Sequence, residues 1–320
     1  MRNPWHPFRG FCCQPGREES LFIHVTVPVI LIIGIGYLFG RYGATDLTAI
    51  SKFSISVLSP ALIFSFLARN PLTLGQMAEM TAAVLLFTAA MAGITWLVIR
   101  VLGMKTFLMP ALMTTVFPNT GNYGLPILLF AYGQEAFSLG VIIVVLNFVL
   151  MYTLGVYFAS LEQSDWRRAA ADVFRLPTTY AAVVGLAVNV LHIPIPDFIY
   201  DPIKMIGDAM IPVVMLILGM QLVHVKPRGD VVPATVSSLV RLVASPAVMV
   251  GICYLLGIGG LTAKILVVQN SMPTAVIMTM IAAQYRTRPD FVAGTTFLST
   301  VMSFATVTGL LYGVNWLFGS

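Results

Sequence analysis

The chain has 320 residues, of which 58% are hydrophobic and only 10% are charged. Because soluble domains carry about a quarter charged residues, this composition excludes an ordinary soluble protein and indicates a membrane protein with several spans. A net charge of +5 would suggest nucleic-acid binding in a soluble chain, but here the basic residues matter for orientation in the lipid bilayer. We therefore expect no nucleic-acid partner.

The predicted elements begin after a polar N-terminal segment. Residues 1–20 lack the apolar core of a signal peptide and predict a disordered tail. The remaining apolar segments approach or exceed the length of a bilayer crossing, which is about 20 helical residues. A polar segment, 161–177, predicts a cytoplasmic linker in the middle of the chain. We predict ten helices, at residues 21–41, 47–69, 77–101, 106–132, 134–160, 178–192, 198–223, 232–257, 262–285 and 290–318.

The basic residues between the predicted helices indicate the orientation. Most of them follow an odd-numbered helix, whereas Arg69 follows an even-numbered one. Because loops rich in Lys and Arg stay in the cytoplasm, both termini are predicted to lie outside it, in a multi-pass protein of the cell inner membrane. The residues that follow odd-numbered helices are Arg41, Arg100, Lys105, Arg167, Arg168, Arg175, Lys226, Arg228, Arg286 and Arg288.

The fourth and ninth predicted helices each contain a sequence that breaks a helix. The fourth has FPNTGNYGLP at 117–126, and the ninth has QNSMPT at 269–274. Proline removes a backbone donor and glycine favours non-helical dihedrals. At the depth of the hydrocarbon core, such backbone is tolerated only where protein buries it or where it lines a wet cavity. Two breaks in corresponding places indicate a transporter built from a repeat.

The repeat is predicted to be inverted. Lys52 precedes Pro60 in the second helix by the same number of residues as Lys204 precedes Pro212 in the seventh. Two sets of five helices must enter the membrane from opposite sides, because five is odd. The prediction is an all-α membrane protein with five-helix repeats at 21–160 and 178–320, in which the broken helices 4 and 9 cross at the substrate site.

The crossing is predicted to bind a small carboxylate. The second half of a broken helix begins with free amides that attract an anion, and the first half ends in free carbonyls that attract a cation. We expect the amides near 119–122 and 271–274 to bind the carboxylate; alternatively, the polar side chains only satisfy the broken backbone, and both interpretations can hold. The candidate substrate-binding residues are Pro118, Asn119, Thr120, Gly121, Asn122, Asn270, Ser271, Pro273 and Thr274.

The charged residues inside the predicted helices do not decide which ion, if any, is coupled to transport. Asp208 either forms a structural ion pair with Lys204, four residues earlier, or takes up a proton that is coupled to transport. Sodium bound at the broken-helix carbonyls, and uncoupled flux driven by the membrane potential, are equally compatible with the sequence. Arg241 either attracts an anion from the cytoplasm or pairs with a neighbour.

Other site chemistry is not indicated. The sequence has no nucleotide-binding loop, no histidine pair at metal-site spacing and no catalytic motif, so we expect neither an enzyme nor a metal or cofactor. Three glycines, Gly34, Gly36 and Gly185, are predicted to allow close packing of helices.

Several of these motifs together resemble the auxin efflux carrier family, in its bacterial type, within the bile/arsenite/riboflavin transporter-like superfamily. The resemblance runs from about Leu21 to the C-terminus, and it rests on FPNTGNYGLP at 117–126, MPTA at 272–275, AQY at 283–285 and Ser299-Thr300. It implies a scaffold of helices 1, 2, 6 and 7 and a moving transport bundle of helices 3–5 and 8–10.

The same resemblance implies a secondary carrier that moves a small organic anion by alternating access. Malate, malonate or an auxin-like carboxylate are the implied substrates. A channel or a solute sensor that uses the same cavity is the alternative. The architecture suggests a homodimer.

Overall fold

The computed structural model describes residues 27–43, 47–69, 74–161, 177–224 and 230–319. Every regular element in these residues is a helix, and their one extended pairing is an isolated antiparallel bridge between Pro118 and Thr274. The prediction of an all-helical chain is thereby confirmed. The predicted tail at 1–20 and most of the predicted linker at 161–177 lie outside the described residues.

Five helical stretches of the described residues are long and apolar enough to cross a membrane. The longest, with 41 residues, exceeds one crossing and changes direction at Gly133, where φ is 80° and ψ is −165°. Positive φ suits glycine, and the sequence predicts the boundary between two helices at this residue. Three shorter apolar helices lie at Ile30–Tyr42, Ser56–Arg69 and Tyr180–Val190. The five long stretches are Gly75–Val101, Thr120–Ser160, Asp197–Met220, Val231–Leu256 and Pro289–Leu317.

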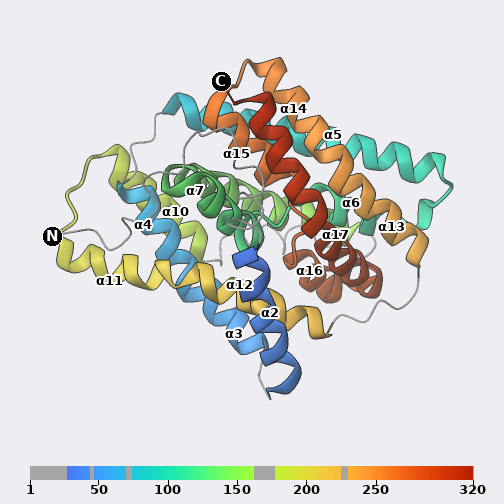
Figure 1. The fold of residues 1–320 in the computed structure, drawn as a ribbon, viewed down its shortest axis with the longest axis horizontal. Coiled ribbons are helices and arrows are strands. Elements are labelled where there is room, and N and C mark those ends of the chain that lie inside the picture. The colour runs from blue at the N-terminus through green and yellow to red at the C-terminus, as the bar shows by residue number, and fades with distance from the viewer. Residues whose placement is uncertain (1–26, 44–46, 70–73, 162–176, 225–229, 320) are drawn as a thin grey trace.

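The helices form two groups, and the first group is coloured blue and yellow-green to gold in Figure 1. Within it, α2 packs along α12, and both α10 and α11 pack on α4. The first helix group consists of α2 (Val27–Tyr42), α3 (Leu47–Phe53), η3 (Ser54–Leu58), α4 (Ser59–Arg69), α10 (Pro177–Val190), α11 (Asp197–Asp208) and α12 (Met210–His224).

The second helix group contains the remaining elements. Here α5 packs on α6 and α14, α13 packs on α17, and α15 packs on α7. This division is the one that the resemblance implies for scaffold and transport bundle. The second group consists of α5 (Leu74–Val101), η4 (Lys105–Phe107), α6 (Leu108–Val116), η5 (Thr120–Gly124), α7 (Leu125–Leu150), η6 (Met151–Gly155), α8 (Val156–Ser160), α13 (Val231–Leu239), η7 (Val240–Ala244), α14 (Ser245–Leu256), α15 (Gly260–Asn270), α16 (Ile277–Tyr285) and α17 (Pro289–Leu317).

The buried apolar side chains form two clusters. The larger cluster fills mainly the second helix group. The smaller cluster lies where the groups meet, and it combines Leu62 and Phe66 of α4, Phe137 and Val141 of α7, and Val214 of α12. Phe66 and Phe137 are in contact, with ring centroids 4.6 Å apart. The groups therefore meet through apolar, non-directional contacts.

Two of the three glycines predicted for close packing have that role. A Cβ on Gly36 of α2 would lie 2.1 Å from the carbonyl oxygen of Leu216 in α12, and one on Gly185 of α10 would lie 3.2 Å from that of Phe64 in α4. The prediction is wrong for Gly34, whose Cβ would have no neighbour within 4 Å. Gly34 stands about 200° round the helix from Gly36 and so faces away from α12.

Candidate functional site: the crossing of two broken helices

The first break separates α6 from η5. Helix α6 ends at Val116, and Phe117 turns into extended backbone with φ −101° and ψ 109°. Pro118 has no N–H with which to continue the helix, and Asn119 (φ −79°, ψ 66°) is also non-helical. A new helix then begins at Thr120 with the π-helical turn η5, a form that recurs at functional sites.

The second break, between α15 and α16, lies directly against the first. The amide of Asn119 donates a hydrogen bond to the carbonyl of Pro273 at 2.8 Å, and the amide of Ala275 donates to the carbonyl of Phe117 at 3.0 Å. Phe117 and Thr274 are fully buried. The two interrupted helices thus cross at their breaks, as the sequence predicts, and their broken backbones partly satisfy each other.

Side chains add further bonds to the crossing. The Thr274 hydroxyl donates to the carbonyl of Thr114 at 2.6 Å, and the Thr274 amide donates to Ser299 Oγ at 3.2 Å. Nearby, Ser303 Oγ donates to the Tyr123 hydroxyl at 3.1 Å. These contacts tie α17 to both breaks.

Hydrogen bonds within the protein already engage several of the backbone amides that were predicted to bind the anion. The amides of Asn119 and Thr274 are engaged as described, and the amide of Ser271 donates to the carbonyl of Val267 at 3.1 Å. The prediction that the amides of both breaks bind a ligand is therefore wrong for these three. It is also wrong for Thr120, whose amide donates to the carbonyl of Pro118 at 2.9 Å, and for Met272, whose amide donates to that of Gln269 at 3.4 Å. In the first turn of η5, by contrast, the amides of Gly121 and Asn122 have no partner among the described residues.

Two predicted side chains carry polar atoms that no described residue satisfies. Asn119 is 95% buried (5% exposed), and its Nδ2 has no partner. Asn270 is fully buried; its Nδ2 donates to the carbonyl of Leu266 at 2.9 Å, whereas its Oδ1 has no partner. Because buried polar atoms are normally hydrogen-bonded, unpaired ones at a helix break indicate a ligand site.

Gln269, which is not among the predicted substrate-binding residues, belongs to the same cluster. Both its Nε2 and its Oε1 are buried without a partner. A Cβ on Gly124 would lie 2.2 Å from Oε1, and one on Gly140 would lie 2.9 Å from Nε2, so the side chain amide occupies a space that these glycines leave open. Its signal in the sequence was a glutamine inside an apolar run, directly before Asn270.

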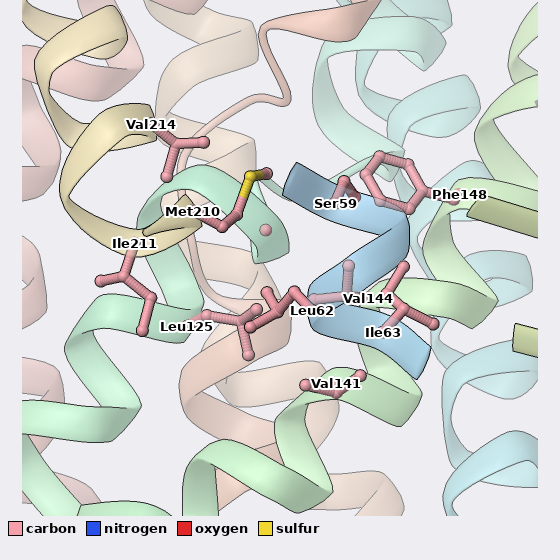
Figure 2. Close-up of a pocket in the computed structure, with 11 residues that line it drawn as sticks. Ser59, Leu62, Ile63, Leu125, Val141, Val144, Phe148, Met210, Ile211 and Val214 are labelled. Atoms are coloured by element: carbon pink, nitrogen blue, oxygen red, sulfur yellow. The ribbon is translucent and has the colours of Figure 1, made fainter. Parts of the chain in front are cut away.

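A small pocket lies beside the first break, between the two helix groups (Figure 2). Its volume of about 10 Å³ has room for one water molecule. Apolar side chains of α4 and α12 face those of α7 across it, and Gly121 of η5 forms part of its wall. The residues that line it are Ser59, Leu62, Ile63, Gly121, Leu125, Val141, Val144, Phe148, Met210, Ile211 and Val214.

Arg241 of η7 is fully buried beside the two breaks. Its Nε donates to the carbonyl of Met272 at 2.8 Å, its Nη1 donates to that of Thr115 at 2.7 Å, and its Nη2 donates to that of Asn270. The guanidinium carbon also lies 5.6 Å from the centre of the Phe87 ring. Of the two interpretations of Arg241, the structure supports pairing with neighbours, and the partners are main-chain carbonyls.

The family follows from a comparison with known proteins. The sequence model of the family described as "Membrane transport protein" matches residues 21–172 and 166–311. The chain belongs to this family, the auxin efflux carrier family. The resemblance that the two breaks indicate is thereby confirmed.

Several curated relatives cover nearly the whole chain. An uncharacterized transporter of Methanothermobacter thermautotrophicus is 24% identical over 87% of this chain and 94% of its own length. One of Methanocaldococcus jannaschii is 20% identical over 88% of this chain and 96% of its own length. Auxin efflux carrier component 8 of Arabidopsis thaliana is 22% identical over 85% of this chain and 91% of its own length.

In this auxin efflux carrier family member, Asp208 forms an ion pair outside the pocket lining. Lys204 Nζ donates to its carboxylate at 2.5 Å, and the two side chains are 42% (Lys204) and 47% (Asp208) exposed. The pair lies within Asp197–Met220, one of the stretches that are long and apolar enough to cross a membrane. In the described part of this family member, no three His, Cys, Asp or Glu residues lie close enough together to hold a metal ion.

Proposed function

We propose that this chain is a secondary carrier that moves a small organic anion across the membrane by alternating access. The observation that carries the proposal is the unpaired amides of Gly121 and Asn122, which begin a helix beside a pocket between two helix groups. The beginning of a helix carries about half a positive elementary charge, which attracts an anion without any ionised side chain. Membership of a membrane transport family supports the assignment.

The architecture that we propose for this carrier is ten helices in two inverted repeats, at 21–160 and 178–320, joined by the linker at 161–177, with both termini outside the cytoplasm. The pocket supports it, because residues next to Pro60 and residues next to Pro212, which are equivalent in the repeat, both line it. The family match also falls into two segments that divide at 166–172, inside the linker.

The substrate is held, in this proposal, at the first break. Its carboxylate accepts hydrogen bonds from the amides of Gly121 and Asn122 and from Nδ2 of Asn119, while Asn270 and Gln269 supply further unpaired polar atoms at the crossing. A hydrogen bond to a charged group contributes about 1.5–3 kcal/mol, so a few such donors are enough for binding in the micromolar to millimolar range.

The pocket lining favours an anion with one carboxylate and an apolar body. Leu62, Val144 and Phe148 are typical of the lining, which includes no charged side chain. A second carboxylate, as in malate or malonate, would be buried there with only the hydroxyl of Ser59 as a side-chain partner in the lining, at a cost of several kcal/mol. An auxin-like carboxylate therefore fits the lining better than a dicarboxylate.

Alternating access requires the helix groups to move. A pocket with room for one water molecule cannot hold an organic anion, so binding of the substrate requires the pocket to widen. Sliding of the second helix group against the first would open the pocket first to one side and then to the other. The apolar cluster between the groups permits such sliding without breaking directional bonds.

Counterflow in proteoliposomes tests the function. We expect saturable exchange with indole-3-acetate or another apolar monocarboxylate, and weaker exchange with malate, malonate, succinate or an amino acid. Exchange of malate alone would contradict the choice of substrate. Binding without exchange would favour a sensor, and flux that does not saturate would favour a channel.

Ion coupling through Asp208 is tested in the same liposomes. Because the Lys204–Asp208 pair lies outside the pocket lining, we expect the Asp208→Asn variant to keep both counterflow and gradient-driven uptake at the level of the wild type. A loss of uptake driven by a pH gradient, with counterflow intact, would instead assign proton coupling to Asp208.

A further inference from the structure

Four basic side chains gather at one end of the second helix group. Arg100 lies in the last turn of α5, Lys105 begins η4, and Arg286 and Arg288 lie in the loop between α16 and α17. All four residues are exposed. We call these four residues the basic patch.

Contacts between the two loops fix the position of the basic patch. Arg288 stacks on Phe107 of η4, with the guanidinium carbon 4.3 Å from the ring centre, and Phe107 contacts Phe291 of α17, with ring centroids 5.1 Å apart. Thr287 is fully buried, and its hydroxyl donates to the carbonyl of Ala159 in α8 at 2.8 Å. The loop after α5 and the loop after α16 are therefore joined, and their charges lie on one surface.

The basic patch carries more charge than the acidic residues beside it balance. Asp230, directly before α13, pairs with Arg288 at 3.6 Å, and Asp290 lies in the first turn of α17. Four basic residues against two acidic ones leave a net charge of +2 among the described residues at this end of the group. Lys105 and Arg286 have no ion-pair partner in the described part of the chain. The patch therefore attracts an anion.

The backbone at Arg286 is strained for an arginine. Helix α16 ends at Tyr285, and Arg286 follows in the left-handed conformation, with φ 54° and ψ 30°. Glycine usually occupies this position after a helix, because it has no Cβ to clash. The amide of Thr287 then donates to the carbonyl of Ala282 at 2.9 Å, which completes the helix cap. An arginine where a glycine would be less strained indicates a use for its side chain.

The basic patch borders an apolar surface of α5. Leu97 and Val101 are exposed, and Trp96 stacks on Arg100, with the guanidinium carbon 4.7 Å from the ring centre. Helix α5 is long and apolar enough to cross a membrane. Tryptophan and arginine at the end of such a helix are typical of the level of the lipid headgroups. An occupant of the patch therefore has acyl chains within reach, which fits a lipid better than a free anion.

We propose that the basic patch binds the headgroup of an anionic phospholipid, whose acyl chains lie along the exposed side of α5. Lys105 and Arg286 supply the charges that no described acidic residue balances, and the paired loops hold them in place. Each Lys or Arg near a membrane surface raises the affinity for anionic lipid by about fivefold. The inference needs neither the pocket nor any transport, so it can be tested on the purified protein alone.

The first test uses the wild-type protein in a neutral detergent. A ligand that binds only the folded state raises the midpoint of thermal unfolding in a saturable way. We expect such a rise with phosphatidylglycerol, and a smaller or no rise with phosphatidylcholine, which has the same phosphate but no net charge. Glycerol phosphate, which lacks acyl chains, should have no effect. An equal rise with phosphatidylcholine or with glycerol phosphate would overturn the inference.

The second test separates lipid binding from stability. The Arg286→Gly variant removes one charge and relieves the left-handed backbone, so its midpoint without lipid should equal or exceed that of the wild type. The concentration of phosphatidylglycerol that gives half of the rise should increase about fivefold, and about 25-fold when Lys105→Gln is added. Arg286→Lys should keep the wild-type concentration. An unchanged concentration in the double variant would contradict the assignment.

A matched variant controls for the total charge of the protein. Arg41 lies in the last turn of α2, in the first helix group, and it is exposed as the residues of the basic patch are. The Arg41→Gln variant should reach half of the rise at the wild-type concentration of phosphatidylglycerol. The same loss of affinity in Arg41→Gln as in Arg286→Gly would show that the lipid responds to overall charge, and it would overturn the proposal of a site at the patch.

Discussion

An alanine at Gly36 is expected to lower the free energy of unfolding by at least about 1–3 kcal/mol, the usual cost of overpacking. The added Cβ would lie 2.1 Å from the carbonyl oxygen of Leu216. Because this neighbour is backbone, it cannot rotate away, so α2 and α12 would have to separate along their contact. The midpoint of thermal unfolding of the purified protein in detergent measures the effect.

Gly34→Ala is the matched control on the same helix. Its Cβ would meet nothing within 4 Å, and alanine favours a helix by about 1 kcal/mol over glycine. The midpoint of this variant should be unchanged or slightly higher. Equal losses in the two variants would contradict the close packing of α2 against α12.

Replacing Asn119 by alanine is expected to reduce exchange by about ten- to a hundredfold, because it removes a hydrogen bond to a charged group worth about 1.5–3 kcal/mol. The fold should tolerate the change, since Nδ2 of Asn119 has no partner among the described residues. Counterflow at low substrate concentration measures the loss, and thermal unfolding verifies that the protein is intact.

Asn315→Ala makes the same chemical change near the end of α17, where the side chain is partly exposed. Its exchange should equal that of the wild type. If Asn119→Ala also exchanges normally while it remains folded, then the side-chain amide of Asn119 does not hold the anion, and the anion binds elsewhere.

The breaks could be predicted from the sequence because their causes are local. Pro118 and Pro273 interrupt a helix in any surroundings, and the amide side chains beside them mark the breaks as polar. The prediction of close packing was correct for Gly36 and wrong for Gly34. The sequence shows that a glycine is present, but it does not show on which side of the helix the neighbouring helix lies.

The partners of Arg241 could not be predicted from the sequence. Its charge suggests an acidic partner or an anion, whereas the structure pairs it with carbonyls of Thr115, Asn270 and Met272, which any residue type would supply. The engaged amides of Asn119 and Thr274 were missed for the same reason: backbone pairing between remote segments leaves no trace in residue type.

The main-chain pairing of the two breaks makes the crossing resistant to separation. Separating the Asn119–Pro273 and Phe117–Ala275 bonds would leave four peptide groups unsatisfied in a medium without water, at several kcal/mol for each group. The contact between the helix groups is made of apolar side chains, which exchange neighbours at little cost. During a conformational cycle the crossing would therefore move as one rigid body. The deformation would take place at the apolar contact surface between the two helix groups.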